Sequence, residues 1–259
     1  MPKMRSKSEA LKTIVGIIVN VINTFSLNSQ KAVDHKFKTQ LANSIYLLTH
    51  IYTLLKFVAD HPQQNKVTDE IFVSQTIMWQ ACNTMFAALQ LTRQGYMLEP
   101  QFLMRQAIES FALAMSFHSS HKAYPLYKKG ELSGEKCIGF AKKMLGEIGQ
   151  IYGLLTSVTH PSRNTTGTAY NEESYSVIFG GGYTEKLSYR TLFDFAMLNY
   201  LLLTIWKGSE LVFYKFETSP MLWEKSGSIY NLKLDDSIKS MVETVKKDFK
   251  QAISELDKK

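Results

Sequence analysis

The chain has 259 residues, 45% of them hydrophobic and 20% charged, so it can bury its own core without a disulfide framework or a structural metal. Two cysteines form no such framework and no Cys/His spacing is typical of zinc, so we expect a reduced, cytoplasmic protein that needs no metal and no cofactor. The net charge of +7 is compatible with an anionic partner such as RNA or a nucleotide, although a basic solvated face is the more ordinary explanation.

Helical periodicity extends over most of the chain. The first predicted helix, residues 8–25, follows a basic stretch as a secretion signal would, but it has no small-residue cleavage site and is too short to span a bilayer. We interpret it as a helix that packs on the core, and we expect no membrane contact. A polar linker then leads to a second helix over residues 35–59, which ends before Pro62 because proline disfavours helix at the preceding residue.

Three more helices are predicted before the composition changes. Thr68 is followed by two acidic residues, which is typical of a first helical turn and predicts a helix over residues 68–93. Pro100 suits the first position of a helix over residues 100–118. After a loop through Gly130, a helix over residues 134–159 ends at His160. Residues 161–186 have loop composition, and the segment YSVIF within them favours a short strand.

Two helices complete the chain, an apolar one over residues 187–216 and an amphipathic one over residues 235–256. The second has apolar residues at alternating spacings of four and three, which indicates a helix packed on its own core or, alternatively, a homodimer seam. The predicted fold is all-α, a single bundle of about seven helices over residues 1–259 with an irregular insertion around residues 161–186. Its parts are amino-terminal helices in 1–62, a core in 68–217 and the carboxy-terminal helix.

A charge pair interrupts the helix over residues 100–118. Arg105 and Glu109 share a stripe with Ala112 and Ser116, and every side of this helix is rich in apolar residues. Because a helix that is apolar all round is a buried one, we expect the pair to be buried or to line a cleft. A buried ion pair adds little net stability, so it indicates a role in function. The alternative is an ion pair that organises the core.

Small residues mark the helix over residues 134–159. Its glycines, Gly139, Gly146, Gly149 and Gly153, fall on the same side as His160 when projected on a helical wheel. A row of small residues lets another backbone approach closely. We therefore hypothesise that this row faces the Ala112 and Ser116 stripe and brings His160 near Arg105 and Glu109.

If these residues lie close together, they could combine proton transfer with anion binding. His160 would transfer protons near neutral pH, Glu109 would orient it, and Arg105 would bind a phosphate or an oxyanion. Ser162 and Arg163 add donors beside the histidine. The alternative for His160 is a cation that stabilises a helix carboxyl end. Asp194 belongs either to the same polar centre or to a near-surface helix start.

Two segments carry a resemblance. LTRQGYMLEPQFLMRQAIESFAL and YGLLTSVTHPSR resemble the signatures of a poorly characterised group of bacterial all-helical proteins, with an Arg-x-x-x-Glu helix and a Tyr…Thr-His-Pro-Ser element. That group is similar to HEPN domains, which are helical bundles of antiviral and toxin–antitoxin systems, and many of these are dimeric, metal-independent ribonucleases. The HEPN catalytic motif is an arginine followed four to six residues later by a histidine. No arginine here fits it, and His160 and Arg163 occur in reverse order.

The resemblance implies a bacterial protein of defence or toxin type that acts on RNA or a nucleotide, as a homodimer. In that reading His160 and Glu109 are catalytic, and Arg105, Ser162 and Arg163 bind the substrate. The alternative is a non-catalytic module that binds a protein partner, in which Arg105 and Glu109 form a structural ion pair.

Overall fold

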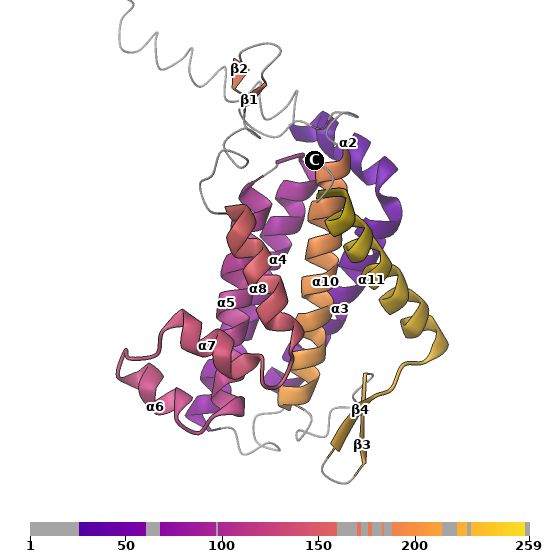
Figure 1. The fold of residues 1–259 in the computed structure, drawn as a ribbon. Helices are drawn as coiled ribbons and strands as arrows, with labels where there is room; N and C mark the ends of the chain where they lie inside the picture. The colour runs from indigo at the N-terminus through magenta and orange to yellow at the C-terminus, as the bar shows by residue number, and fades with distance from the viewer. Residues whose placement is uncertain are drawn as a thin grey trace, which may run out of the picture.

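The protein is all-α, as predicted, and its described residues also include two short antiparallel strand pairs (Figure 1). The computed structural model describes residues 26–60, 68–96, 98–159, 170–171, 176–177, 183, 188–213, 222–226 and 229–256. The helix predicted over residues 8–25 lies outside the described residues.

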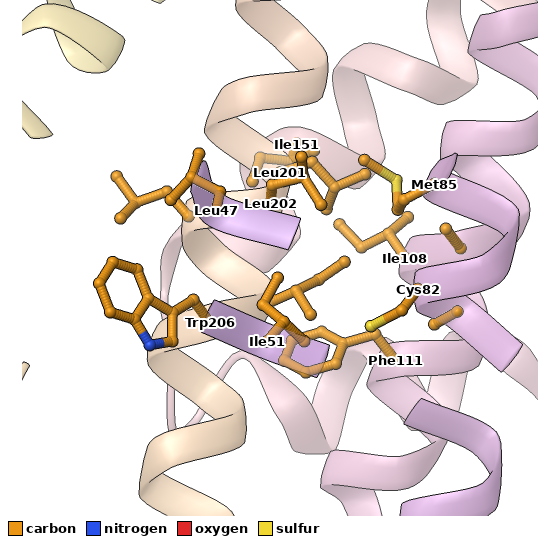
Figure 2. Close-up of a cluster of buried hydrophobic side chains, with 14 of the residues drawn as sticks. Leu47, Ile51, Cys82, Met85, Ile108, Phe111, Ile151, Leu201, Leu202 and Trp206 are labelled. Carbon is orange, nitrogen blue, oxygen red and sulfur yellow. The ribbon is translucent and has the colours of Figure 1, made fainter. Parts of the chain in front are cut away.

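The long helices of the described residues pack around α10 (Ser188–Phe213). This helix contacts α3 (Lys38–Asp60), α4 (Asp69–Arg93) and α5 (Glu99–Ser119), while α8 (Glu147–Thr159) packs against α5 and α11 (Asp236–Leu256) against α10. The long apolar run of α10 fits this position, because nearly all of its side chains are buried. Figure 2 shows side chains from α3, α4, α5, α8 and α10 meeting in one core.

Capping chemistry explains where α4 begins. The Thr68 hydroxyl accepts a hydrogen bond from the Ile71 amide at 3.4 Å, and Asp69 and Glu70 occupy the first turn.

The polar linker predicted before the second helix is wrong, because α2 (Leu27–Lys36) forms there. Asp34 of α2 accepts two hydrogen bonds from Arg93 of α4, at 2.8 and 2.6 Å. This long-range pairing stabilises a helix that the local composition did not indicate.

The segment between α5 and α8 differs from the prediction in two ways. The predicted loop contains a short helix, α6 (Ala123–Lys128). The predicted helix over residues 134–159 is divided into α7 (Gly134–Ala141) and α8 by a turn over residues 142–146. Leu145, in that turn, is buried in the core, and α7 and α8 on either side of the break both contact α5.

Two hairpins interrupt the helical fold. Strands β1 (Tyr170–Asn171) and β2 (Ser176–Val177) pair antiparallel, which confirms the short strand expected in the segment YSVIF. Strands β3 (Trp223–Ser226) and β4 (Ile229–Leu232) form a second antiparallel pair with Trp223 opposite Leu232. This second hairpin was not predicted from the sequence pattern.

Buried charges of α10 anchor the segment that leads into β3. The Glu210 carboxylate accepts one hydrogen bond from Trp206 Nε1 at 2.8 Å and another from the Leu222 amide at 2.9 Å. The neighbouring Lys207 forms an ion pair with Glu147 at 2.5 Å, and its carbonyl accepts from Trp223 Nε1 at 3.0 Å. These bonds satisfy polar groups that would otherwise be costly to bury.

The apolar seam of α11 is buried within the chain. Ile238, Val242, Val245, Phe249 and Ala252 all lie in the core, and Phe249 stacks on Tyr200 of α10 with ring centroids 4.1 Å apart. The interpretation of α11 as a helix packed on its own core is therefore confirmed, and its seam is not available to a second chain.

A glycine permits a close approach of α5 to α10 in the core. A Cβ atom added at Gly208 of α10 would lie 2.4 Å from Phe111 Cζ, 2.9 Å from Met115 Sδ and 3.1 Å from Leu145 Cδ1. Phe111 and Met115 are fully buried residues of α5. The absence of a side chain at Gly208 is therefore what allows the Phe111 ring to lie against the α10 backbone.

Candidate functional site

A row of polar side chains runs along α5 at spacings of four residues. It consists of Gln101, Arg105 and Glu109, which we call the α5 polar row. Gln101 is buried, whereas Arg105 and Glu109 are half-exposed. Because residues four apart lie on one side of a helix, the row forms a strip that descends from the amino end of α5. Gln101 contacts α10 and Arg105 contacts α8, while Glu109 pairs with Arg105 within α5.

Arg105 is held from three directions. Its Nε donates to Glu109 Oε1 at 3.2 Å, and its Nη1 donates to Thr159 Oγ1 at 3.1 Å. Its guanidinium carbon lies 5.7 Å from the centre of the Tyr152 ring, a favourable cation–π arrangement. The side chain is nevertheless 27% exposed. The guanidinium is thus fixed in position and still reaches solvent.

Thr159 connects this cation to the end of α8. Its hydroxyl accepts from Arg105 and donates to the Leu155 carbonyl at 2.7 Å. Because the hydroxyl proton is used within α8, its oxygen is oriented as an acceptor toward Arg105. One turn earlier, the Thr156 hydroxyl is buried and has no hydrogen-bond partner among the residues that the structure describes.

The electrostatics keep Arg105 charged. Desolvation acts to lower the pKa of Arg105, but hydrogen bonds with Tyr152 and Glu109 outweigh it, so the pKa lies above its usual value. A guanidinium remains protonated at every physiological pH. The site therefore presents a permanent positive charge beside one carboxylate.

Of the two positions expected for Arg105 and Glu109, full burial is wrong, and a position that lines a cleft stays a prediction. Their side chains are 27% and 39% exposed, respectively. The sequence argument failed because α5 carries apolar side chains on its solvent side as well, and Phe102 is exposed there. Apolar composition all round a helix does not imply burial all round when surface positions also hold hydrophobic residues.

The close-packing role predicted for the glycines of residues 134–159 is also wrong. A Cβ atom added at Gly139, Gly146 or Gly153 would meet nothing within 4 Å, and one at Gly149 would meet only the Lys142 side chain, at 3.6 Å. The turn over residues 142–146 breaks the single helix on which the row was projected. Instead, α8 packs through Ile148, Ile151, Leu155 and Thr159.

The two elements nevertheless meet at one point, where Arg105 contacts Thr159. Thr159 is the last residue of α8 and immediately precedes His160 in the sequence. His160, Ser162 and Arg163 lie outside the described residues. The described part of the predicted centre is therefore Arg105 and Glu109, and the sequence analysis missed the contacts of Arg105 with Tyr152 and Thr159.

A second polar contact lies one turn before Arg105. Gln101 donates to Asp194 Oδ1 of α10 at 2.8 Å, and Asp194 is almost completely buried. Burial raises the pKa of Asp194 to about 8, although Gln101 and Arg190 act to lower it. Of the two interpretations of Asp194, the near-surface helix start is wrong. The four-residue spacing from Gln101 to Arg105 was the signal that could have extended the row.

The site lies at one end of the bundle. The amino-terminal halves of α5 and α10 and the carboxyl end of α8 come together there (Figure 1). Within the described part of the chain, no group of three or more His, Cys, Asp or Glu side chains could hold a metal ion. No helix in the same residues has the length and apolar character needed to cross a membrane. The described chemistry around Arg105 is one fixed guanidinium, a carboxylate, a phenol and two threonine hydroxyls, and the buried pair of Gln101 and Asp194 lies one turn away.

Comparison of the chain with protein-family models, curated proteins and solved structures gave no match in any of the three.

Proposed function

We propose that this chain is a HEPN-like bacterial protein of defence or toxin type that binds a phosphate group of RNA or a nucleotide at Arg105. The observation that carries the proposal is the fixed guanidinium: Glu109, Tyr152 and Thr159 hold it, and part of the side chain stays exposed. A preorganised arginine suits a phosphate because its planar fork matches the phosphate oxygens. The net charge of +7 favours the same class of ligand.

In this proposal the THPSR segment completes the site. His160 acts as the acid/base group, and Ser162 and Arg163 contribute further phosphate contacts. Glu109 holds Arg105 at its Nε and also supplies a carboxylate that can orient an imidazole. The connection between Arg105 and Thr159, the residue before His160, supports this assignment.

Binding to single-stranded RNA and to nucleotides tests the proposal directly. We expect Arg105→Gln to weaken binding at least about tenfold, because a charge-assisted phosphate contact contributes about 1.5–3 kcal/mol. Lys142→Gln is the matched control, since it removes one positive charge from an exposed position away from Arg105. Fluorescence anisotropy with a labelled oligonucleotide measures both. Equal weakening by the two substitutions would mean that only the overall charge attracts RNA.

Catalysis needs a separate test. Wild type and His160→Ala are incubated with labelled RNA with and without EDTA, and the products are separated on a denaturing gel. Expression in bacteria gives toxicity and RNA integrity for the same pair. We expect cleavage and toxicity to be lost in His160→Ala, with an unchanged circular dichroism spectrum. Equal behaviour of the two proteins rejects the catalytic role of His160.

A non-catalytic interaction module is the second candidate. It is favoured by the fact that Arg105 also links α5 to α8 through Thr159, as a purely structural cation would. For such a module, Arg105→Gln lowers the free energy of unfolding and leaves RNA and nucleotide affinity unchanged. The pair of measurements therefore separates the two candidates.

A further inference from the structure

Arg105 has hydrogen-bonding capacity that the fold does not use. A guanidinium carries five N–H donors. Contacts with Glu109, Thr159 and Tyr152 take three of them, so two remain without a partner among the residues that the structure describes. Because a guanidinium can donate two N–H groups to one phosphate at the same time, the remaining pair is sufficient to hold an anion.

Glu109 lies beside this pair, and its charge has the wrong sign for an anion. Its Oε1 accepts from Arg105 Nε at 3.2 Å, so a phosphate on the remaining N–H groups would lie next to a carboxylate. Negative charges that close repel each other. Fixing Arg105 does not require an exposed carboxylate, because Thr159 and Tyr152 hold the same guanidinium. We therefore expect a ligand that brings a hydrogen-bond donor next to its phosphate.

The second oxygen of Glu109 can accept from that donor. Within the described part of the chain Oε2 takes part in no hydrogen bond, and the side chain is 39% exposed. A carboxylate only accepts hydrogen bonds and has about four lone-pair sites. It can therefore bind a hydroxyl group of a ligand and still orient the imidazole of the proposed function. The site then offers donors to an anion and an acceptor to a hydroxyl group on a neighbouring atom.

An aromatic side chain next to the pair indicates which class of hydroxy phosphate fits. Phe102 precedes Arg105 by three residues, so the two side chains are neighbours on the surface of α5. The Phe102 side chain is 50% exposed and can contact a planar group. Aromatic side chains stack on nucleobases whatever the base is. A phosphate, a hydroxyl group and a base are together the parts of a ribonucleotide.

We propose that Arg105 and Glu109 together recognise a ribonucleotide through its 2′-hydroxyl and the phosphate on the neighbouring 3′-oxygen. The inference rests on the proposed function, and it narrows the ligand from RNA or a nucleotide to a ribose 3′-phosphate, free or within a strand. A 5′-phosphate does not fit, because the ribose ring separates it from the 2′-hydroxyl. Glu109 is then the residue that determines specificity, since the 2′-hydroxyl distinguishes RNA from DNA.

Three mononucleotides of the same base test the proposal on the wild-type chain. Isothermal titration calorimetry compares adenosine 3′-phosphate with 2′-deoxyadenosine 3′-phosphate and adenosine 5′-phosphate. We expect the first ligand to bind about fivefold to tenfold more tightly than the other two, which is the effect of one charge-assisted hydrogen bond at a half-exposed site. Equal affinity for all three overturns the proposal. Because this comparison uses no variant, it does not depend on whether a substituted chain folds.

The substitution Glu109→Met tests which residue reads the hydroxyl group. It removes both acceptor oxygens, so adenosine 3′-phosphate and its 2′-deoxy analogue should bind with equal affinity, while the circular dichroism spectrum matches wild type. Glu131→Met is the matched control, because it removes one exposed carboxylate from the segment between α6 and α7 and should keep the wild-type preference. A folded Glu109→Met variant that weakens both ligands and keeps their affinity ratio overturns the proposal, since a carboxylate that only positions Arg105 behaves in that way.

A strand separates failure of this proposal from failure of the proposed function. RNA, DNA and 2′-O-methyl RNA of one sequence are compared by fluorescence anisotropy, and we expect 2′-O-methyl RNA to bind like DNA, because methylation removes the proton that Glu109 accepts. If wild type binds none of them, or if Arg105→Gln binds RNA as wild type does, both proposals are rejected. If Arg105→Gln loses RNA binding but wild type binds the three strands equally, only the recognition of the 2′-hydroxyl is rejected.

Discussion

Replacing Gly208 with alanine adds one methyl group at a close contact between α10 and α5 in the core. The new Cβ atom would lie 2.4 Å from Phe111 Cζ and 2.9 Å from Met115 Sδ. Phe111 is fully buried between α4, α5 and α10, so its ring cannot turn into solvent. Overpacking of this kind costs about 1–3 kcal/mol, and the better helix propensity of alanine returns about 1 kcal/mol. Because the clash involves a ring carbon, we take the upper value and expect a net loss of about 2 kcal/mol.

Urea denaturation followed by circular dichroism measures this loss, and the melting temperature should fall by about 4–8 °C, since each kcal/mol shifts it by about 2–4 °C in a chain of this size. Gly153→Ala is the matched control. Its Cβ atom meets nothing within 4 Å in α8, so only the propensity gain of about 1 kcal/mol remains. Adding Phe111→Leu to Gly208→Ala should recover part of the loss, as coupled neighbours do. A Gly208→Ala variant as stable as Gly153→Ala would refute the reasoning.

Two buried carboxyl groups give further predictions. Glu210→Ala leaves the donors of Trp206 and Leu222 unpaired, so we expect a loss of about 2–4 kcal/mol in the free energy of unfolding, together with faster amide exchange in β3 and β4; unchanged exchange would contradict the anchoring role. Asp194, with a pKa raised to about 8, binds its proton more tightly in the folded state than in the unfolded state. Its contribution to stability is therefore full at low pH and is lost as the pH rises from about 4 to about 8. Asp194→Asn should be close to wild type at pH 4 and more stable than wild type at pH 9 by an amount on the order of a few kcal/mol, as urea denaturation at both pH values would show; a stability difference independent of pH would contradict the burial of an ionisable proton there.

Helices with strong local signals were predictable. The Thr68 cap with Asp69 and Glu70 predicted the start of α4 within one residue, and the seam of α11 predicted which of its side chains are buried. In both cases the information lies within one or two helical turns. The polar segment before α3 forms α2, and its Asp34 pairs with Arg93, which lies 59 residues further along the chain. A pattern within one or two helical turns does not predict a contact between residues 59 positions apart.

The candidate site was also predictable only in part. Arg105 and Glu109 were found from their spacing, and their salt bridge is formed. Their half-exposed position was not predictable, since it depends on which side of α5 its neighbours leave open. The glycine argument failed for a related reason. A helical wheel assumes one continuous helix. The turn over residues 142–146 breaks that helix, so positions before and after the turn cannot be projected on one wheel. The glycine that does allow a close approach is Gly208. It lies in an apolar run, where hydrophobic periodicity does not indicate which side of the helix faces which neighbour.

The central position of α10 affects how the chain is made. The buried hydrogen bond from Ser44 Oγ of α3 to Asn199 Oδ1 of α10, at 2.6 Å, joins residues 155 positions apart. At synthesis rates of about 5–20 residues per second, α3 leaves the ribosome about 8–30 s before its partner. During that interval the faces of α3, α4 and α5 that α10 will cover have no native partner. Nascent chains of this protein are therefore expected to bind chaperones until residue 213 has emerged, and a truncation before α10 should be captured by them permanently.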